Sequence, residues 1–304
     1  MLITGWGGQI AQYVKKELED YELYGVGSGD GFVYSRDSLE LALDSIIPDI
    51  VIHLSGISNS EEAKENVLKT LEVNGLQCAR ICEVIKKRGW KTKLVNASSS
   101  EIYKGHINKC VEEDDTYYNN LHPYSIGKVL SHTTIQYYRK EYDLPFSNAV
   151  LFMTESKIRN ESFLLAKVKK HASGWSSSKS AVLTLGSLDS YRNINHAEDV
   201  ASAIHIIINQ DKGDDYLVCG NEHYKVLDIV KKIYMLYNIV LEGGCDDDDD
   251  DILYDSYSGL PVIKINRGFR GLVTDINGNS TKLANLGWRV KHTIDTIIID
   301  INKC

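Results

Sequence analysis

Three side chains near the middle of the chain have the chemistry and spacing of a site that removes a proton from an alcohol. Tyr124 and Lys128 stand four residues apart in a stretch with helical periodicity, so they share one helix face. An ammonium beside a phenol lowers the pKa of the phenol from about 10, which predicts a usable base near neutral pH. The hydroxyl of Ser99 could polarise the same substrate oxygen. Because a Tyr–Lys pair occurs by chance in many proteins, the interpretation depends on the elements around it.

Apolar runs and amphipathic stretches alternate through the first half of the chain and predict the frame for this site. A repeated strand–helix–strand order needs right-handed crossovers and gives a parallel sheet covered by helices on both faces. Ser99 follows the fourth predicted strand, at the carboxyl edge where open parallel sheets bind their ligands. We expect strands at residues 1–4, 21–26, 49–54, 93–97 and 145–152, and helices at residues 9–19, 38–46, 60–88 and 123–142.

A glycine-rich turn follows the first predicted strand. Gly5, Gly8 and Ala11 have the G-x-x-G-x-x-A spacing, which supplies a tight turn, close backbone approach to a pyrophosphate and a small residue where helix meets strand. Together with Tyr124 and Lys128, the turn predicts a nicotinamide cofactor that takes the hydride when the alcohol loses its proton.

The end of the second predicted strand favours NADP over NAD. NAD sites place a carboxylate there to bind the ribose hydroxyls. This strand is followed by Gly27, Ser28 and Gly29, and the first carboxylate is Asp30. We therefore expect NADP, with Ser28 near its 2′-phosphate and NAD as the alternative.

The second half of the chain has a less regular pattern. We predict helices at residues 159–171, 197–209 and 227–237, a strand at 181–185 and a loop-rich stretch at 245–278. The expected organisation is a dinucleotide-binding domain over residues 1–152 and a mainly substrate-binding lobe over residues 153–304. Residues 181–209 are expected to rejoin the main sheet.

Composition excludes several other classes of function. The formal net charge of the 304 residues is -8, so we expect no nucleic-acid partner and no anionic membrane surface. No apolar run approaches the roughly 20 residues of a membrane span, and the N-terminus does not resemble a secretory signal. Six scattered cysteines predict free thiols in the cytoplasm. The acidic run at 246–251 lacks the pattern of a calcium loop, so it predicts a solvated loop, and we expect no metal site.

These motifs resemble the extended short-chain dehydrogenase/reductase family, and within it the nucleotide-sugar 4,6-dehydratases, especially the GDP-mannose type. The resemblance covers nearly the whole chain but is strong only at its motifs. The first group of matching stretches is the glycine-rich turn, residues 53–56, Asn74, residues 97–103 and the Tyr124–Lys128 pair. The second group is Leu151 and Phe152, Glu155 and Ser156, residues 185–192, residues 196–199 and residues 286–288.

The resemblance implies a Rossmann-type doubly wound α/β sheet with a smaller C-terminal substrate lobe, in a homodimer or homotetramer. It also implies that Glu101 assists loss of water from a sugar nucleotide once C4 of the sugar is a ketone. We expect Arg side chains to bind the substrate phosphates. The predicted catalytic residues are Ser99, Glu101, Tyr124 and Lys128. The predicted cofactor-binding residues are Gly5, Gly8, Gln9, Ile10, Ser28, Leu54, Ser55, Gly56, Asn74, Tyr124 and Lys128. The predicted substrate-binding residues are Ser100, Glu155, Arg192, Arg267 and Arg270.

Some positions depart from the pattern that the resemblance implies. Met153 replaces an Asn that holds the substrate, and Lys157 and Ile158 replace a Pro and an Arg. The Arg-rich loop after the second strand is missing. UDP-N-acetylglucosamine is therefore an alternative to GDP-mannose, with or without inversion at C5. A reductase or epimerase of the same family and a non-catalytic dinucleotide-binding protein are the alternative functions.

Overall fold

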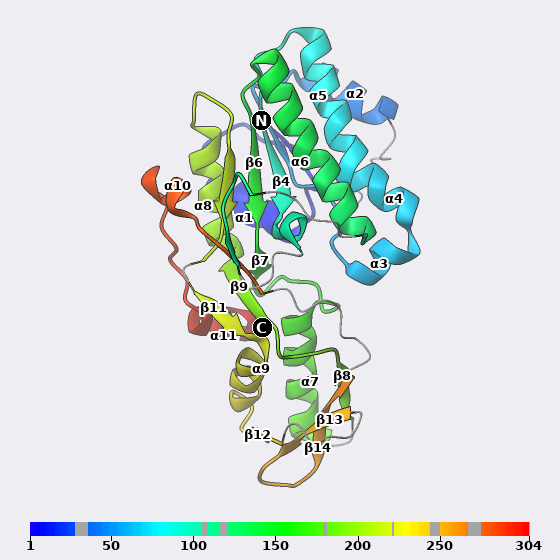
Figure 1. The fold of residues 1–304 in the computed structure, drawn as a ribbon, viewed down its shortest axis with the longest axis vertical. Coiled ribbons are helices and arrows are strands. Elements are labelled where there is room, and N and C mark those ends of the chain that lie inside the picture. The colour runs from blue at the N-terminus through cyan, green and yellow to red at the C-terminus, as the bar shows by residue number, and fades with distance from the viewer. Residues whose placement is uncertain are drawn as a thin grey trace.

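The computed structural model describes residues 1–27, 36–104, 109–115, 121–178, 181–220, 222–243, 250–266 and 275–303. The molecule is elongated, with a large α/β part at one end and a smaller part at the other (Figure 1). Among the described helices, none is long and apolar enough to cross a membrane.

A six-stranded parallel sheet forms the centre of the large part, in the order β10-β6-β4-β3-β1-β2. Its inner strands are runs of buried residues, as expected for a sheet covered on both faces. The predicted doubly wound sheet is confirmed. The strands are β1 (Leu2–Thr4), β2 (Tyr24–Val26), β3 (Ile50–His53), β4 (Lys93–Ser99), β6 (Phe146–Leu151) and β10 (Asp215–Val218).

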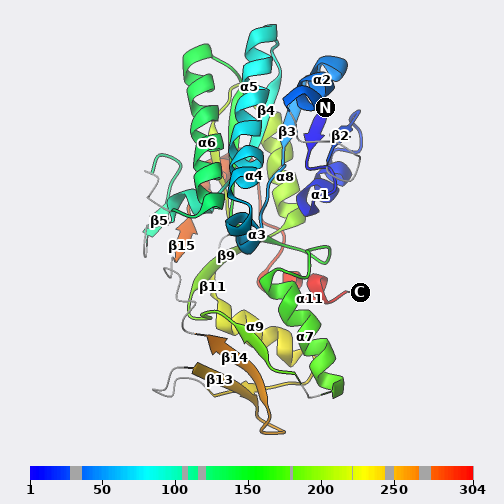
Figure 2. The same cartoon turned by 90° about the vertical axis from the view of Figure 1, so that its right-hand side faces the viewer.

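Helices cover both faces of this sheet (Figures 1 and 2). Helices α1 and α8 pack together on one face, and α2, α5 and α6 pack on the other. Each face is sealed by an aliphatic cluster, because the helices present their apolar sides to the sheet. The helices are α1 (Gln9–Glu17), α2 (Arg36–Ile46), α5 (Gln77–Arg88), α6 (Pro123–Tyr142) and α8 (Ala197–Ile208), with the short α10 (Thr281–Asn285) beside β10.

The single helix predicted over residues 60–88 is wrong. The stretch divides into α3 (Ser60–Glu65), α4 (Val67–Leu71), a π-helical turn (Glu72–Leu76) and α5. Asn66 interrupts the helix with φ −124° and ψ 57°. The π-helical turn presents Asn74, which accepts a hydrogen bond from Ile57 N at 2.7 Å and donates one to Ile57 O at 3.0 Å. The π-helical turn therefore holds the loop after β3 in place.

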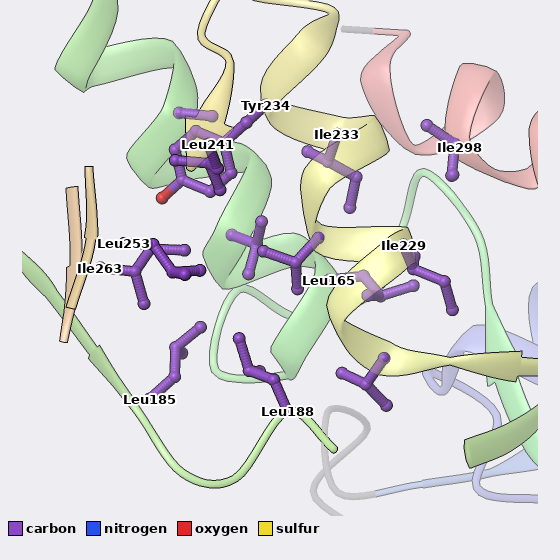
Figure 3. Packing of buried hydrophobic residues seen from close by; sticks show 14 of the residues in the cluster. Leu165, Leu185, Leu188, Ile229, Ile233, Tyr234, Leu241, Leu253, Ile263 and Ile298 are labelled. Atoms are coloured by element: carbon purple, nitrogen blue, oxygen red, sulfur yellow. The ribbon is translucent and has the colours of Figure 1, made fainter. Parts of the chain in front are cut away.

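Three small sheets and three further helices are formed by the rest of the described residues. The smaller end of the molecule has its own core, in which Leu165, Ile229, Ile233 and Ile263 pack together (Figure 3). The sheets have the orders β11-β9-β7, β12-β13-β14-β8 and β15-β5. Their strands are β5 (Lys109–Val111), β7 (Met153–Glu155), β8 (Leu183–Leu185), β9 (Tyr191–His196), β11 (His223–Lys225), β12 (Leu241–Glu242), β13 (Asp250–Asp255), β14 (Pro261–Asn266) and β15 (Ile276–Gly278). The helices are α7 (Leu164–Ser178), α9 (Val226–Met235) and α11 (Ile294–Asn302).

Several predictions for the second half need correction. The stretch 245–278 is not simply loop, because β13 and β14 form an antiparallel hairpin that buries Leu253, Val262 and Ile263. Asp250 and Asp251, from the acidic run, begin β13, while residues 246–249 lie outside the described part. Helix α7 begins at Leu164 and not at residue 159, because turns occupy residues 156–163.

The strand that rejoins the main sheet is also different from the one expected. Residues 181–209 contribute β8 and β9 to smaller sheets and only the helix α8 to the face of the large one. The joining strand is β10, which pairs in parallel with β6. Four cysteines, Cys78, Cys82, Cys110 and Cys219, are free thiols; Cys245 and Cys304 lie outside the described residues.

Candidate active site

A cavity of about 510 Å³ lies at the carboxyl ends of the parallel strands, where the large and small parts of the molecule meet. It collects most of the predicted site residues that the structure describes. Those lining it are Gly5, Gly8, Gln9, Ile10, Leu54, Gly56, Ser99, Ser100, Glu101, Tyr124, Lys128, Glu155 and Arg192. Ser28, Arg267 and Arg270 lie outside the described residues.

The glycine-rich turn joins β1 to α1 as the sequence predicts. Gly5 has φ +71°, and a Cβ there would lie 2.9 Å from both Leu54 C and Ser55 N, so only glycine fits. Gly8 donates from its N–H to Gly5 O at 2.8 Å and starts the helix. The N–H groups of the first turn of α1 therefore point toward the cavity without a side chain to cap them, as an anion-binding site requires.

Ser99 and Glu101 occupy the turn that ends β4. The Ser99 hydroxyl accepts a hydrogen bond from Glu101 N at 3.2 Å and so starts a short 3-10 turn, Ser100–Tyr103. This turn places the half-exposed Glu101 carboxylate at the cavity, where it pairs with Lys104 at 3.1 Å. A carboxylate that is accessible and held only by a surface ion pair is free to reach a ligand.

Tyr124 and Lys128 lie in the first two turns of α6. Pro123 is the first residue of the helix, and His122 caps it by accepting a hydrogen bond from Tyr124 N at 3.2 Å. Lys128 is buried, and its Nζ donates to Ala97 O at 2.7 Å. Desolvation by burial lowers the pKa of Lys128 to about 8, so the side chain is still mostly an ammonium at neutral pH.

The expected lowering of the Tyr124 pKa is wrong for the protein alone. Burial raises the pKa of Tyr124 above 10, and the carboxylate of Glu101 adds to the rise. A hydrogen bond with Ser99 and the charge of Arg159 act in the opposite direction but do not outweigh burial. Lys128 has little effect because its Nζ lies 6.0 Å from the Tyr124 ring centroid and is directed to Ala97.

Two predicted cofactor residues form the wall behind the cavity and do not line it. Asn74 is buried and uses its amide on both backbone groups of Ile57. Ser55 is buried too, and its N–H donates to Thr4 Oγ1 at 3.2 Å. Both residues hold the loop that carries Gly56.

Glu155 is a buried carboxyl group at the end of β7 that lines the cavity. Neither of its oxygens has a hydrogen-bond partner among the described residues. Burial raises its pKa to about 7, although the charge of Arg159 opposes the rise. An unpartnered buried carboxyl group in a cavity is suited to accept hydrogen bonds from a ligand hydroxyl.

Arg159 is a cavity residue that the sequence interpretation did not select. Its Nη1 donates to Gln9 Oε1 at 2.8 Å, and its guanidinium stacks 3.5 Å from the centre of the Phe163 ring. Gln9 Nε2 donates in turn to Ser156 Oγ at 2.8 Å. In the sequence, the one indication that Arg159 belongs to the cavity was its position four residues after Glu155, because its partner Gln9 lies 150 residues away.

Arg192, on β9, also lines the cavity, and its Nη1 donates to Tyr191 O at 2.8 Å. Two histidines of the matching motifs have structural contacts. His53 Nδ1 lies 2.8 Å from Thr4 Oγ1, and burial followed by the charge of Lys128 lowers the His53 pKa to about 3. His196 caps α8 and contacts Asp300 Oδ2 at 3.0 Å.

His196, Glu198 and His292 place potential metal-ligating atoms within 4.8 Å of one another. The two imidazole rings are stacked, with centroids 4.0 Å apart. Because metal ions bind in the ring plane, stacked rings do not converge on one ion, and each ring already contacts a carboxylate, Asp300 or Asp199.

Comparisons with known proteins show the family of the chain. The family model described as GDP-mannose 4,6 dehydratase matches residues 30–301. A GDP-mannose 4,6 dehydratase of Dictyostelium discoideum is 24% identical over 292 residues, which cover 94% of this chain and 81% of that protein. Matches to other curated relatives cover between 48% and 85% of their lengths.

Solved structures show the same fold. RMD from Pseudomonas aeruginosa, complexed with NADPH, has a TM-score of 0.78 at 19% identity, covering 99% of this chain and 97% of that one. DesIV, a dTDP-glucose 4,6-dehydratase from Streptomyces venezuelae with NAD and TYD bound, has a TM-score of 0.79 at 14% identity, covering 99% and 95%. On the extent of the family match, this chain belongs to the GDP-mannose 4,6 dehydratase family.

Proposed function

We propose that this chain is a nucleotide-sugar 4,6-dehydratase that converts an NDP-hexose to the NDP-4-keto-6-deoxyhexose for deoxysugar biosynthesis. The observation that carries the proposal is the convergence of Ser99, Glu101, Tyr124 and Lys128 with the glycine-rich turn on one cavity. Membership of the GDP-mannose 4,6 dehydratase family supports the same reaction. Residues 1–152 mainly bind the cofactor in this proposal, and residues 153–304 mainly bind the sugar nucleotide.

The cofactor of the proposal is NADP, with NAD as the alternative. The residues fit a dinucleotide, because Gly5 and Gly8 permit close backbone approach and the first turn of α1 offers free N–H groups to a pyrophosphate. Gln9, Ile10, Leu54 and Gly56 form the adjoining wall. When bound, the nicotinamide supplies a reversible hydride acceptor.

Tyr124 and Ser99 handle the first proton transfer. Tyr124 first loses its own phenolic proton to solvent when the ligands bind. As the phenolate it then takes the proton of the sugar 4-hydroxyl, and the Ser99 hydroxyl holds the same oxygen of the substrate. Lys128 supplies positive charge behind the phenol and fixes the start of α6 against β4 through Ala97 O. Oxidation at C4 leaves a ketone, which makes the hydrogen on C5 acidic.

Glu101 carries the elimination of water. Its partly exposed carboxylate removes the C5 proton, the electron pair forms the C5–C6 double bond, and the C6 hydroxyl leaves as water with the proton that the carboxylate has taken up. C6 then receives back the hydride given up at C4, and C5 receives a proton from water, which gives the 4-keto-6-deoxy product. Ser100, Glu155 and Arg192 bind the substrate, with Glu155 accepting from a sugar hydroxyl and Arg192 facing the phosphates. Arg267 and Arg270, which lie outside the described residues, are proposed as further phosphate ligands.

The sugar nucleotide is UDP-N-acetylglucosamine or GDP-mannose, and the C5 proton returns with or without inversion. We further propose a homodimer or homotetramer. Exposed apolar side chains on the α3–α5 stretch and on α6 support contact between copies there; they are Val67, Leu68, Leu76, Ile126 and Leu130. Free cysteines favour action in the reducing cytoplasm.

The test is incubation of the purified protein with UDP-, GDP- and dTDP-hexoses, followed by mass spectrometry and NMR of the products. We expect a 4-keto-6-deoxy product from one sugar nucleotide with no net consumption of NADPH. Stoichiometric oxidation of NADPH would instead identify a reductase, and absence of any product with the whole panel would contradict the proposal.

Glu101→Gln tests the elimination step directly. We expect it to lose product formation while it still binds cofactor and substrate. Glu61→Gln is a matched control, because Glu61 pairs with Lys64 at 3.0 Å across the same three-residue spacing as Glu101 and Lys104. Full activity of Glu101→Gln would show that the carboxylate does not act as the base.

A further inference from the structure

Three consecutive residues at the end of β4 are each held by one residue of α6. Ala97 O accepts from Lys128 Nζ at 2.7 Å, and Ser98 Oγ lies 2.8 Å from His132 Nδ1. Ser99, the third residue, interacts with Tyr124, and both line the cavity. Lys128 and His132 are one helical turn apart, so the strand end and the helix face are joined at successive positions.

The Ser98–His132 contact is completely buried and leads away from the cavity. His132 has no exposed surface, and Ser98 is 2% exposed. The other ring nitrogen of His132, Nε2, lies 3.5 Å from Asp215 Oδ2 on β10. The proposed reaction uses neither residue; Ser98 lines the cavity, but its hydroxyl contacts His132, which is not among the cavity residues.

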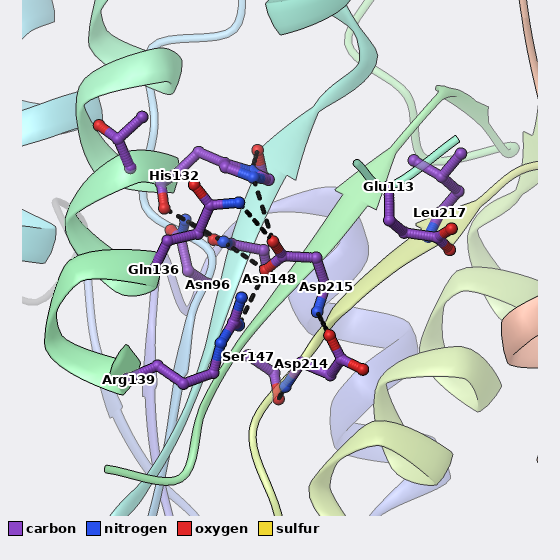
Figure 4. A network of polar contacts seen from close by, with 12 residues as sticks. Asn96, Glu113, His132, Gln136, Arg139, Ser147, Asn148, Asp214, Asp215 and Leu217 are labelled. Carbon is purple, nitrogen blue, oxygen red and sulfur yellow. Dashed lines mark hydrogen bonds and ion pairs between the residues drawn. The ribbon is translucent and has the colours of Figure 1, made fainter. Parts of the chain in front are cut away.

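Asp215 is the fixed end of this chain of contacts (Figure 4). Its carboxylate accepts from Gln136 Nε2 at 2.6 Å, from Arg139 Nη1 at 2.9 Å and from Asn148 Nδ2 at 2.8 Å. Burial alone would raise its pKa, but the contacts with His132 and Arg139 outweigh burial and hold the pKa well below its usual range. Asp215 is therefore always an acceptor.

The Asp215 carboxylate sets the direction of the Ser98–His132 hydrogen bond. The 3.5 Å between His132 Nε2 and Asp215 Oδ2 is an ion-pair distance and not a hydrogen bond, but the negative charge favours the tautomer with its proton on Nε2, which leaves Nδ1 as the acceptor for the Ser98 hydroxyl proton. Ser98 is thereby held in one rotamer, and the peptide that links it to Ser99 is held with it. A small shift of Ser99 would change its contact with Tyr124, and misplacement by 1 Å can cost on the order of 100-fold in rate.

We propose that Ser98, His132 and Asp215 form a buried positioning relay that sets the placement of Ser99 relative to Tyr124 and thereby controls turnover. The predicted effect of the relay on turnover rests on the proposed function. The predicted effect of the relay on Tyr124 does not depend on any substrate. All three members are positioning residues, because they act through Ser99.

Ser98→Ala and His132→Asn are the test variants. Alanine removes only the hydroxyl, and asparagine can keep a polar atom near the Nδ1 position but is too short to reach Asp215. With the sugar nucleotide that the wild type accepts, we expect turnover to fall on the order of 10- to 100-fold. KM and the Kd for NADP should stay within about twofold, because His132 and Asp215 are not among the cavity residues and the Ser98 hydroxyl contacts His132. Tyr138→Phe is the matched control, since it removes a hydrogen bond of the same helix, to Glu83, and leaves the contacts of Asp215 and Ser98 in place.

A substrate-free measurement separates failure of the relay from failure of the proposed function. In protein labelled with 13C at tyrosine Cζ, the Tyr124 signal is identified by its absence in Tyr124→Phe, and its titration is followed by NMR. We expect the Tyr124 pKa to rise in Ser98→Ala and His132→Asn but not in Tyr138→Phe, because a displaced Ser99 no longer stabilises the phenolate. An unchanged Tyr124 pKa in both variants, or an equal rise in Tyr138→Phe, would overturn the relay even if no sugar nucleotide were turned over.

Discussion

Lys128 Nζ donates a hydrogen bond to the carbonyl oxygen of Ala97 at 2.7 Å and lies 6.0 Å from the centroid of the Tyr124 ring. The ammonium is held by the strand that carries Ser99, not by the phenol. Its first effect is to join α6 to β4, and its charge reaches Tyr124 only across a distance at which burial dominates. In the protein alone Tyr124 is therefore a protonated phenol at neutral pH.

We expect Lys128→Met to change the pH dependence of stability. The Lys128 pKa is about 8 in the folded protein and 10.5 as the ordinary value of a lysine, so between these pH values the unfolded chain binds more protons at this side chain. Stability from this group therefore rises with pH through the window, by at most about 1.4 kcal/mol per pH unit. Urea unfolding from pH 7 to 10.5 should show the wild type gaining stability relative to Lys128→Met, with Lys64→Met as the control for loss of an exposed lysine. A constant difference would contradict the burial argument.

Tyr124→Phe should abolish most turnover without harming the fold. Phenylalanine keeps the ring and removes only the hydroxyl, so we expect turnover to fall by roughly 10²- to 10⁴-fold, as for loss of a general acid–base group. Cofactor affinity, measured by calorimetry, should change less than about twofold. Tyr137→Phe is the control, because Tyr137 is an exposed tyrosine on the same helix. Equal activity of the two variants would remove Tyr124 from the mechanism.

Glu155→Gln is expected to change stability with the opposite pH dependence. Burial raises the Glu155 pKa from 4.5 to about 7, so between these values the folded protein holds a proton that the unfolded chain has lost. Stability from this carboxyl group is fully present below pH 4.5 and is lost as pH rises to 7, by at most about 1.4 kcal/mol per pH unit. Glutamine stays neutral, so the wild type should lose stability relative to Glu155→Gln over this range.

The same measurement on Glu161→Gln provides the control for Glu155, because the Glu161 side chain is 67% exposed. Chemical unfolding at pH 4.5, 5.5, 6.5 and 7.5 is sufficient. If the difference in free energy of unfolding between the wild type and Glu155→Gln stays constant over this pH range, the Glu155 carboxyl group is either exposed or paired.

The sequence predicted the main sheet because its signals are local. The strand β6 is six buried residues in a row, and α6 begins at its proline and ends where helical periodicity ends. The hairpin of β13 and β14 was missed because the acidic run before it resembles a solvated loop, while its stability comes from Leu253 and Ile263 packing on helices far away in the sequence. The π-helical turn at 72–76 has no local signal either, since the loop that its Asn74 holds lies at Ile57.

The candidate site was predictable where its residues belong to short motifs and not where they depend on tertiary contacts. Ser99, Glu101 and Tyr124 were selected correctly as cavity residues. Arg159 was not selected, because its place depends on Gln9, which lies 150 residues away in the sequence. The rise in the Tyr124 pKa was missed for the same reason: burial is a property of the fold, whereas helical spacing indicates only that Lys128 shares its face.

The glycine-rich turn allows a comparison of two substitutions only two residues apart. Gly5→Ala places a Cβ 2.9 Å from the backbone of Leu54 and Ser55 at φ +71°, so strain or displacement of the loop is unavoidable. We expect a loss of about 1–3 kcal/mol in the free energy of unfolding. NADP binding should weaken by about tenfold or more, since 1.4 kcal/mol of displacement cost is tenfold in affinity.

Gly7→Ala is the control, because no heavy atom of the described residues, apart from its chain neighbours, lies within 4 Å of its added Cβ, and its φ is not in the left-handed region. It should be neutral or stabilise the fold by up to about 1 kcal/mol through the lower entropy of the unfolded chain. Thermal unfolding and calorimetric titration with NADP measure both effects on both variants. If Gly7→Ala weakened NADP binding as much as Gly5→Ala, both glycines would be required because the ligand lies close to the whole turn. The contact of Gly5 with the loop at Leu54 would then not explain the loss of NADP binding.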